Sequence, residues 1–283
     1  MCNFLRENWN KHILINFFFL NAVMRGELQT CALASGSSGN CFYVGNGKGA
    51  VLIDAGISTK QICARMQERG LSPEKVRGIF VTHEHSDHVR GIDVFARKFR
   101  VPVFATRKTA AASLLCSEET LIQIIRNTEE IGIAGMLIEA FGKDHEAADP
   151  VSYTISAGKK RVSVITDLGH ACKRVQEQVS EADFLFLESN HDVHMLQTGN
   201  YPEILKQWIL SDTGHLSNRQ AGLCVLEHAS PRLRYVVLSH ISEHNNAPQL
   251  ALKTFLKLVK ERSDLSLETE VSVRGEATKV WKI

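Results

Sequence analysis

The sequence predicts a layered α/β fold in which helices pack against sheets. Strand-like apolar runs alternate with stretches whose apolar residues recur at helical spacing, and the connections between them are short. The composition agrees with this fold class, because 44% of the 283 residues are hydrophobic and 23% are charged. A chain of this composition can bury a large core, and it is unlike disordered, acidic-tail or collagen-like chains.

The first half of the chain begins with strands and continues with a helix that starts at a capping box. Ser58 is the expected N-cap of this helix, Gln61 stands three positions later, and Gly70 is expected to end the helix. A continuous apolar run at 78–82 has the pattern of a buried strand. Apolar residues at helical spacing between 89 and 99 follow it. The first expected strands are 28–34, 41–45 and 50–54.

The second half continues the same mixture of strands and helices. One helix is expected after Ser217, where Gln220 completes a second capping box. Another is expected from about 247 to 262, with Pro248 in its first turn. No low-complexity linker and no shift in composition marks an internal boundary. The expected strands are 136–141, 151–156, 162–166, 184–188 and 235–239.

The N-terminus is interpreted separately from the fold. Residues 13–23 form the most apolar stretch, but 11 residues cannot span a bilayer, which needs roughly 20. Two asparagines interrupt the stretch and no A-x-A cleavage site follows it, which argues against a signal peptide. A second methionine, Met24, stands just before the first expected strand. We interpret 1–23 as an extension outside the fold and 24–283 as one domain; a signal peptide and a docked helix are the alternatives.

Charge and cysteine content limit the partners and the compartment. The formal net charge of +2 gives no bulk attraction to nucleic acid, although a local basic patch would suffice for binding. The seven cysteines are odd in number, and no two have C-x-x-C spacing. This pattern argues against a disulfide framework and against a cysteine-based zinc site. We therefore expect a cytoplasmic protein without stable membrane association.

The strongest signal for chemistry is the run from Thr82 to His88, directly after the buried strand. It reads Thr-His-Glu-His-Ser-Asp-His and places four metal-competent side chains within six residues. Alternate side chains of an extended loop point to the same side, so several donors face one point. Imidazoles and a carboxylate are ligands that zinc accepts, as do manganese and iron to a lesser extent. The run therefore predicts a metal site.

Further donors follow other expected strands. Asp54, Asp167 and His240 each end an apolar strand, and His145 follows the strand 136–141 by a few residues. Open α/β sheets place their sites at the carboxyl ends of strands. The sequence thus predicts that these four residues join the histidine loop in one metal centre.

With these residues, the chain resembles the metallo-β-lactamase-fold hydrolases over about residues 28–283. Within that superfamily it is most similar to the bacterial WalJ/YycJ-type members, which are exonuclease-like. This resemblance implies a four-layer αββα sandwich with the site in the cleft between two sheets. The runs that carry the closer similarity are 33–40, 166–170, 188–192, 214–218 and 238–242.

The resemblance also implies a dinuclear centre that holds two divalent ions, Zn²⁺ or Mn²⁺. In the family pattern, His83, His85 and His145 hold one ion, Asp87, His88 and His240 hold the second, and Asp167 bridges both. Asp54, Asp87 and His215 are expected to be catalytic: Asp54 orients or deprotonates a water, and His215 acts near the leaving group. The expected substrate contacts are Asn190, His191 and Ser217.

The implied reaction is hydrolysis of a phosphodiester by a hydroxide that bridges the two metals and attacks phosphorus. Two ions roughly 3.5–4 Å apart can stabilise both the attacking and the leaving oxygen. By resemblance, we expect a DNA exonuclease working in the 5′-to-3′ direction. The alternative from another substrate class is a dinuclear hydrolase of a small thioester or cyclic nucleotide, and a third is a binding or redox protein that uses the same metal site.

Overall fold

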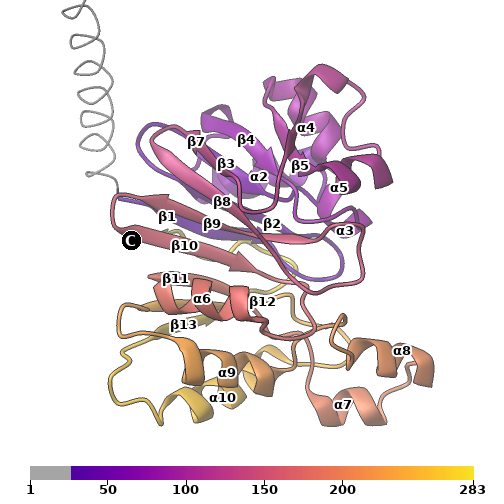
Figure 1. Cartoon of the computed structure of the whole chain (residues 1–283), viewed down its shortest axis with the longest axis vertical. Coiled ribbons are helices and arrows are strands. Elements are labelled where there is room, and N and C mark those ends of the chain that lie inside the picture. The colour runs from indigo at the N-terminus through magenta and orange to yellow at the C-terminus, as the bar shows by residue number, and fades with distance from the viewer. Residues whose placement is uncertain (1–26) are drawn as a thin grey trace, which may run out of the picture.

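The computed structural model describes residues 27–283, which form two seven-stranded mixed sheets packed face to face (Figure 1). The interpretation of residues 1–23 as an extension lies outside the described residues. The first sheet has the strand order β14-β1-β2-β3-β4-β5-β6. Its strands are β1 (Gln29–Ala34), β2 (Cys41–Gly45), β3 (Ala50–Ile53), β4 (Val76–Phe80), β5 (Val103–Thr106), β6 (Ile122–Ile125) and β14 (Trp281–Lys282).

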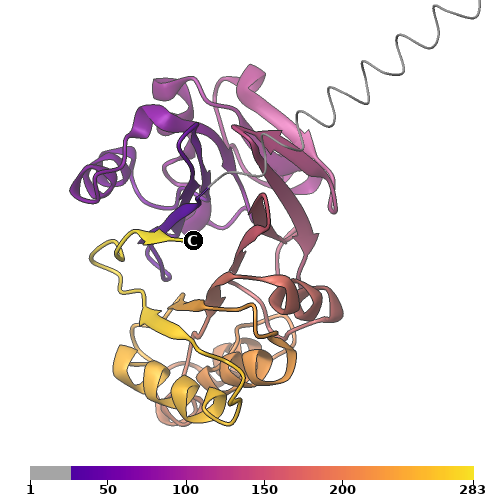
Figure 2. The same ribbon diagram turned by 90° about the vertical axis from the view of Figure 1, so that its left-hand side faces the viewer.

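The second sheet has the order β13-β12-β11-β10-β9-β8-β7. Figure 2 shows how the chain, after completing this sheet, returns at its C-terminal end to the first sheet, where β14 pairs antiparallel with β1. Both halves of the chain therefore contribute to the first sheet. The strands of the second sheet are β7 (Glu130–Ile133), β8 (Met136–Gly142), β9 (Val151–Ala157), β10 (Lys160–Ile165), β11 (Phe184–Glu188), β12 (Tyr235–Ser239) and β13 (Glu268–Val271).

Helices cover the outer face of each sheet, which completes four layers and confirms the predicted αββα sandwich (Figure 1). The helices beside the first sheet are α2 (Thr59–Glu68), α3 (Ser86–Val89), α4 (Ile92–Phe99) and α5 (Arg107–Ala112), with 3₁₀ turns at Pro73–Lys75 and Glu119–Leu121. Those beside the second are α6 (Lys173–Glu181), α9 (Asn218–His228) and α10 (Pro248–Val259). Two short helices, α7 (Val193–Thr198) and α8 (Glu203–Ile209), project beyond the layers.

Alternation along the strands explains why the layers pack. In β2, Phe42 and Val44 belong to the core between the sheets, whereas Cys41 and Tyr43 belong to the core under α2 and α4. Successive strand residues point to opposite faces, so a strand that is buried on both sides must be apolar at every position. Three buried clusters result, one between the sheets and one under each helical layer.

The core between the sheets draws on strands from both halves of the chain. This supports our proposal that 24–283 is one domain. No helix among residues 27–283 is long and apolar enough to cross a bilayer. The capping boxes at Ser58 and Ser217 are present as predicted, with both reciprocal hydrogen bonds in each.

Candidate metal centre

The histidine loop follows β4 and is held by backbone contacts from two other segments. Asn40 N donates to the Asp87 carbonyl at 2.7 Å, and Ala55 N donates to the His88 carbonyl at 2.9 Å. Gly56 allows this close approach, because a Cβ there would lie 1.6 Å from the Asp87 carbonyl oxygen. The loop that carries the candidate ligands therefore has a defined position relative to the ends of β2 and β3.

Three candidate residues at strand ends share an unusual backbone conformation. Asp54 follows β3, Asp167 follows β10 and His240 follows β12, with φ angles of 59°, 58° and 55°. The left-handed region is unfavourable for residues with a Cβ, by about 1–2 kcal/mol each. Such conformations persist only where the surrounding structure imposes them, and they concentrate at functional sites. At each position the chain turns sharply as it leaves the strand.

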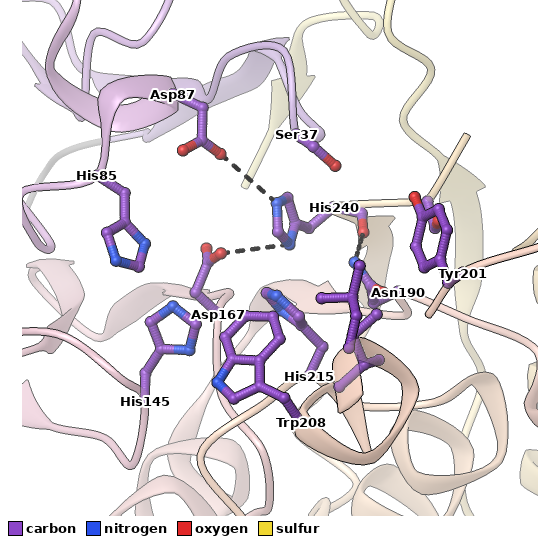
Figure 3. Close-up of a pocket in the computed structure, with 13 residues that line it drawn as sticks. Ser37, His85, Asp87, His145, Asp167, Asn190, Tyr201, Trp208, His215 and His240 are labelled. Carbon is purple, nitrogen blue, oxygen red and sulfur yellow. Dashed lines mark hydrogen bonds and ion pairs between the residues drawn. The ribbon is translucent and has the colours of Figure 1, made fainter. Parts of the chain in front are cut away.

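The structure brings the predicted metal ligands together. Figure 3 shows those that line the cavity, which are His85, Asp87, His145, Asp167 and His240. Donor atoms of His83, His85 and His145 lie within 4.8 Å of one another, as do those of Asp87, His88 and His240. Asp167 forms a further such group with His83 and His88, one member from each set. These groups agree with the division that the family resemblance implies, although Asp167 and His240 also form a group with Glu188 and His215. The role of each residue as a ligand stays a prediction.

Unpaired polar atoms test whether these residues fit a metal. His145 Nε2, Asp167 Oδ2 and His240 Nε2 are buried and have no hydrogen-bond partner among the described residues. An unpaired buried polar group costs about 1–3 kcal/mol. Imidazole nitrogens and carboxylate oxygens are the donors that Zn²⁺ and Mn²⁺ accept. Divalent ions between these atoms would satisfy them, so the donor set fits the expected cofactor.

The charges of the centre also fit a cation. Burial disfavours a charge on His240, but Asp167, Asp87 and Glu188 outweigh burial and raise the pKa of His240 to about 10. Burial opposes ionisation of Asp167 as well, yet the imidazoles of His240 and His88 hold the pKa of this carboxyl well below its usual range. In the metal-free protein, the carboxylates thus keep protons on the neighbouring imidazoles. A bound divalent ion would supply this positive charge in place of the protons.

In the other histidine group, His83 and His145 are neutral. Burial, with smaller contributions from neighbouring positive charges, lowers the pKa of His145 to about 4 and holds that of His83 well below its usual range. A histidine must be neutral to bind a metal. His83 and His145 are therefore ready to bind a cation at neutral pH.

Metal affinity is expected to rise as the pH increases from about 6 to 9. His240 binds a cation only in its neutral form, and in the metal-free protein its pKa is about 10. Raising the pH therefore removes a proton that competes with the metal. Titration of metal-free protein with Mn²⁺ at several pH values measures the effect. An affinity that does not change with pH would contradict this exchange of proton for metal.

Asp54 supports the centre and is not one of the residues that line the cavity. Its Oδ2 accepts from His88 Nδ1 at 2.7 Å and from Thr82 Oγ1 at 2.8 Å, and its Oδ1 accepts from Thr82 N at 2.8 Å. The side chain is fully buried. All of these contacts are to His88 and Thr82, so Asp54 holds the His88 ring in position here, and the expectation that Asp54 also meets the attacking water stays a prediction.

Glu188, at the end of β11, holds two histidine rings in position by hydrogen bonds. Its Oε1 accepts from His215 Nδ1 and from His240 Nδ1, both at 2.8 Å. Its Oε2 accepts from the backbone N–H groups of Leu168 at 3.0 Å and Leu216 at 3.2 Å. Burial raises the pKa of Glu188, but His215 and His240 outweigh burial and lower it to about 2. From the sequence, Glu188 was considered as a residue that touches substrate or supports metal ligands, but it was not among the predicted site residues; its signal is a carboxylate at the end of the apolar run 184–187.

A cavity of about 260 Å³ opens beside the centre, and the predicted substrate residues differ in their relation to it. His215 and Asn190 line it; Asn190 Nδ2 also donates to the His240 carbonyl at 3.0 Å. His191 is fully buried and does not line it. The Ser217 hydroxyl caps α9 through Gln220 and does not line the cavity either. Among these residues, only His215 and Asn190 are placed to touch a substrate.

Sequence reasoning missed several residues of the site. The fully buried Asn40 donates through Nδ2 to Asp87 Oδ2 at 3.2 Å. Lys143 is buried behind the centre, where its Nζ donates to the Thr166 carbonyl at 2.6 Å and burial lowers its pKa. Tyr201 and Trp208 line the cavity from the segment that carries α7 and α8. No local pattern distinguishes these side chains from ordinary polar or aromatic residues.

Comparison with known proteins gives one family and several relatives. The family model described as "Metallo-beta-lactamase superfamily" matches residues 34–186. The chain is 37% identical over 238 residues to "Exodeoxyribonuclease YycJ" of Bacillus anthracis, covering 83% of this chain and 90% of the relative. It is 36% identical over 248 residues to "Exodeoxyribonuclease WalJ" of Streptococcus pneumoniae, covering 85% of this chain and 91% of the relative.

Solved structures agree on the fold. The metallo-beta-lactamase fold protein YhfI from Bacillus subtilis superposes with a TM-score of 0.68 at 14% identity, covering 92% of this chain and all of that one (100%). A diphosphatase from the PhnP family superposes with a TM-score of 0.61 at 16% identity, covering 91% of this chain and 98% of that one. At these identities the superpositions concern the fold alone.

Proposed function

Since the chain belongs to the metallo-beta-lactamase superfamily and is a metal-dependent hydrolase, we propose that it is a dinuclear exodeoxyribonuclease that degrades DNA in the 5′-to-3′ direction. The names of the YycJ and WalJ relatives support DNA as the substrate. One observation supports the dinuclear centre most: two groups of three donors lie next to each other, and Asp167 has donor atoms near members of both.

Two divalent ions, Zn²⁺ or Mn²⁺, would stabilise negative charge on a phosphodiester and lower the pKa of a water. In this proposal His83, His85 and His145 hold one ion, and Asp87, His88 and His240 hold the other. The carboxylate of Asp167 lies between the groups and offsets part of the added charge. Asp87, which lines the cavity, is a ligand in contact with the substrate side of the centre.

His215 is the group we assign to the leaving oxygen. Glu188 accepts from His215 Nδ1 at 2.8 Å, which leaves Nε2 for a proton that can be passed to the substrate. The ring lines the cavity, and its centroid lies 5.1 Å from that of His240, so the two imidazoles are neighbours. A proton held at this position would assist departure of an alkoxide.

We also propose that the protein works in the cytoplasm. The cysteines at positions 31, 41, 63, 116, 172 and 224 are free, which supports a reducing compartment. No ion pair or cavity of the centre involves a cysteine among the described residues.

A nuclease assay tests the function. Purified protein with Mn²⁺ or Zn²⁺ is incubated with DNA labelled at the 5′ or the 3′ end, beside the Asp87→Ala/His88→Ala variant. We expect wild type to release mononucleotides first from the 5′ end and the variant to lose activity, because it lacks two donors of one group. Asp93→Ala, on the neighbouring helix α4, is the matched control and should keep activity. Equal activity of wild type and the double variant on DNA would overturn the proposal, as would hydrolysis only of small thioesters or cyclic nucleotides.

A further inference from the structure

The segment between β11 and α9 builds a wall that the metal centre does not account for. It carries α7 and α8, which project beside the two sheets (Figure 1). Tyr201, Leu205, Trp208 and Ile209 all line the cavity. Their spacing of four, three and one positions places them on one side of α8 and its preceding turn, because residues three and four apart share a helix face. One face of this short helix is therefore directed at the site.

The two walls of the cavity differ in chemistry (Figure 3). One wall consists of the imidazoles and carboxylates of the metal centre, and the other consists of aromatic and aliphatic side chains. Tyr201, Leu205 and Trp208 are only half-buried, so this wall is not part of the closed core. A ligand that fits both walls must combine an anionic group with an apolar, flat group.

Trp208 lies next to His215 in the cavity wall. Its ring stands edge-on to His215, with centroids 5.4 Å apart and an interplanar angle of 87°. Its indole nitrogen is buried and has no acceptor among residues 27–283. A flat group lying against Trp208 would therefore sit next to the residue that we assign to the leaving oxygen.

A nucleobase is the flat group that DNA offers. Stacking of bases on aromatic side chains is tolerant of sequence, because every base has a π-face. The cavity of about 260 Å³ lies between this aromatic wall and the candidate metal ligands, so a base that stacks on the wall places its phosphate beside those ligands. A base held in a duplex is also covered on its faces and paired at its edge, and it must leave the stack to use such a wall.

On the basis of the exodeoxyribonuclease function proposed above, we propose that Tyr201 and Trp208 form a stacking platform for the terminal nucleobase of an unpaired DNA end. The phosphodiester then lies against the metal ligands, while the base lies against α8. The platform does not select among the four bases, because every base has a π-face.

The test compares two substrates with five proteins. The substrates are a DNA duplex that carries one unpaired nucleotide at the end that is attacked, and the same duplex with an abasic tetrahydrofuran residue at that position. The proteins are wild type, Trp208→Ala, Trp208→Phe, Tyr201→Ala and the matched control Ile204→Ala. Ile204 lies on the same helix, is 81% exposed and does not line the cavity.

We expect Trp208→Ala to raise KM for the normal end about tenfold, in line with the loss of one base–aromatic stack. The same variant should change KM for the abasic end by less than about twofold, because no base is present to stack. Trp208→Phe should restore most of the loss, Tyr201→Ala should act like Trp208→Ala but more weakly, and Ile204→Ala should behave as wild type.

An equal loss on normal and abasic ends would overturn the platform, since that result means that Trp208 only supports His215 or α8. If Trp208→Ala fails to fold by circular dichroism, Tyr201→Ala carries the same comparison between substrates. Failure of the nuclease function itself looks different, because wild type would then cleave neither substrate.

Discussion

Replacement of Asp167 by alanine is expected to release bound metal and to lower DNA hydrolysis by about a thousandfold or more. Asp167 is almost completely buried, and its two oxygens face different partners: Oδ1 lies 3.3 Å from His240 Nδ1 and Oδ2 lies 3.5 Å from His88 Nε2. Without this carboxylate the two donor groups lose the negative charge they share. Metal ions contribute several kcal/mol to such reactions, and each 1.36 kcal/mol is a factor of ten in rate.

Two measurements check this result. Elemental analysis of dialysed protein gives the ions per chain, and end-labelled DNA gives the rate. Asp167→Asn separates charge from shape, because it keeps the side-chain volume; it should lose nearly as much as the alanine variant. Asp212→Ala, an exposed site on the surface nearby, is the control. If Asp167→Ala retained both its metal and its rate, the dinuclear centre as assigned here would be wrong.

Replacement of Glu188 by glutamine is expected to lower kcat about 10- to 100-fold, as is usual for residues that orient metal ligands. One oxygen of Glu188 accepts hydrogen bonds from both His215 and His240. Glutamine keeps the volume but has only one acceptor oxygen, and it removes a charge that both imidazoles face. Both rings should therefore lose their fixed orientation.

A substrate with a good leaving group distinguishes the role of His215 from that of His240. A p-nitrophenyl ester of a nucleotide needs no proton donor for its leaving group, whereas the alkoxide released from DNA does. His215→Ala should therefore lose activity on DNA and keep most of it on the p-nitrophenyl ester. Glu188→Gln should lose activity on both substrates, because it also releases His240. A Glu188→Gln variant with wild-type kcat on DNA would show that the carboxylate does not position either ring.

The candidate ligands could be predicted because their signals are local. The donors of the histidine loop stand within six residues, and Asp54, Asp167 and His240 each follow an apolar strand that ends close to where the structure ends it. Parallel neighbours such as β10, β11 and β12 bring their carboxyl ends to one edge of the sheet, so residues far apart in sequence meet there.

What could not be predicted depends on contacts between distant segments. Glu188 and His240 are 52 positions apart, and their hydrogen bond has no sequence pattern. The orientation of Asp54 toward His88, 34 positions away, has no sequence pattern either. The strands β5, β6, β7, β13 and β14 were missed. Of these, β6, β7, β13 and β14 lie at sheet edges and are only partly buried, so they lack a continuous apolar run, whereas β5 lies inside the first sheet but has only four residues.

The left-handed backbone at Asp54, Asp167 and His240 sets stability against activity. Glycine would adopt these angles without steric cost, so folding alone would favour it at all three positions. Glycine, however, has no side-chain atom that can bind a metal. The centre would lose a candidate ligand at Asp167 or His240, or, at Asp54, the residue that positions His88. Selection for thermal stability alone, without a requirement for hydrolysis, would therefore favour glycine at the positions on which the chemistry depends. Consensus or computational stabilisation of this chain should leave these three residues unchanged.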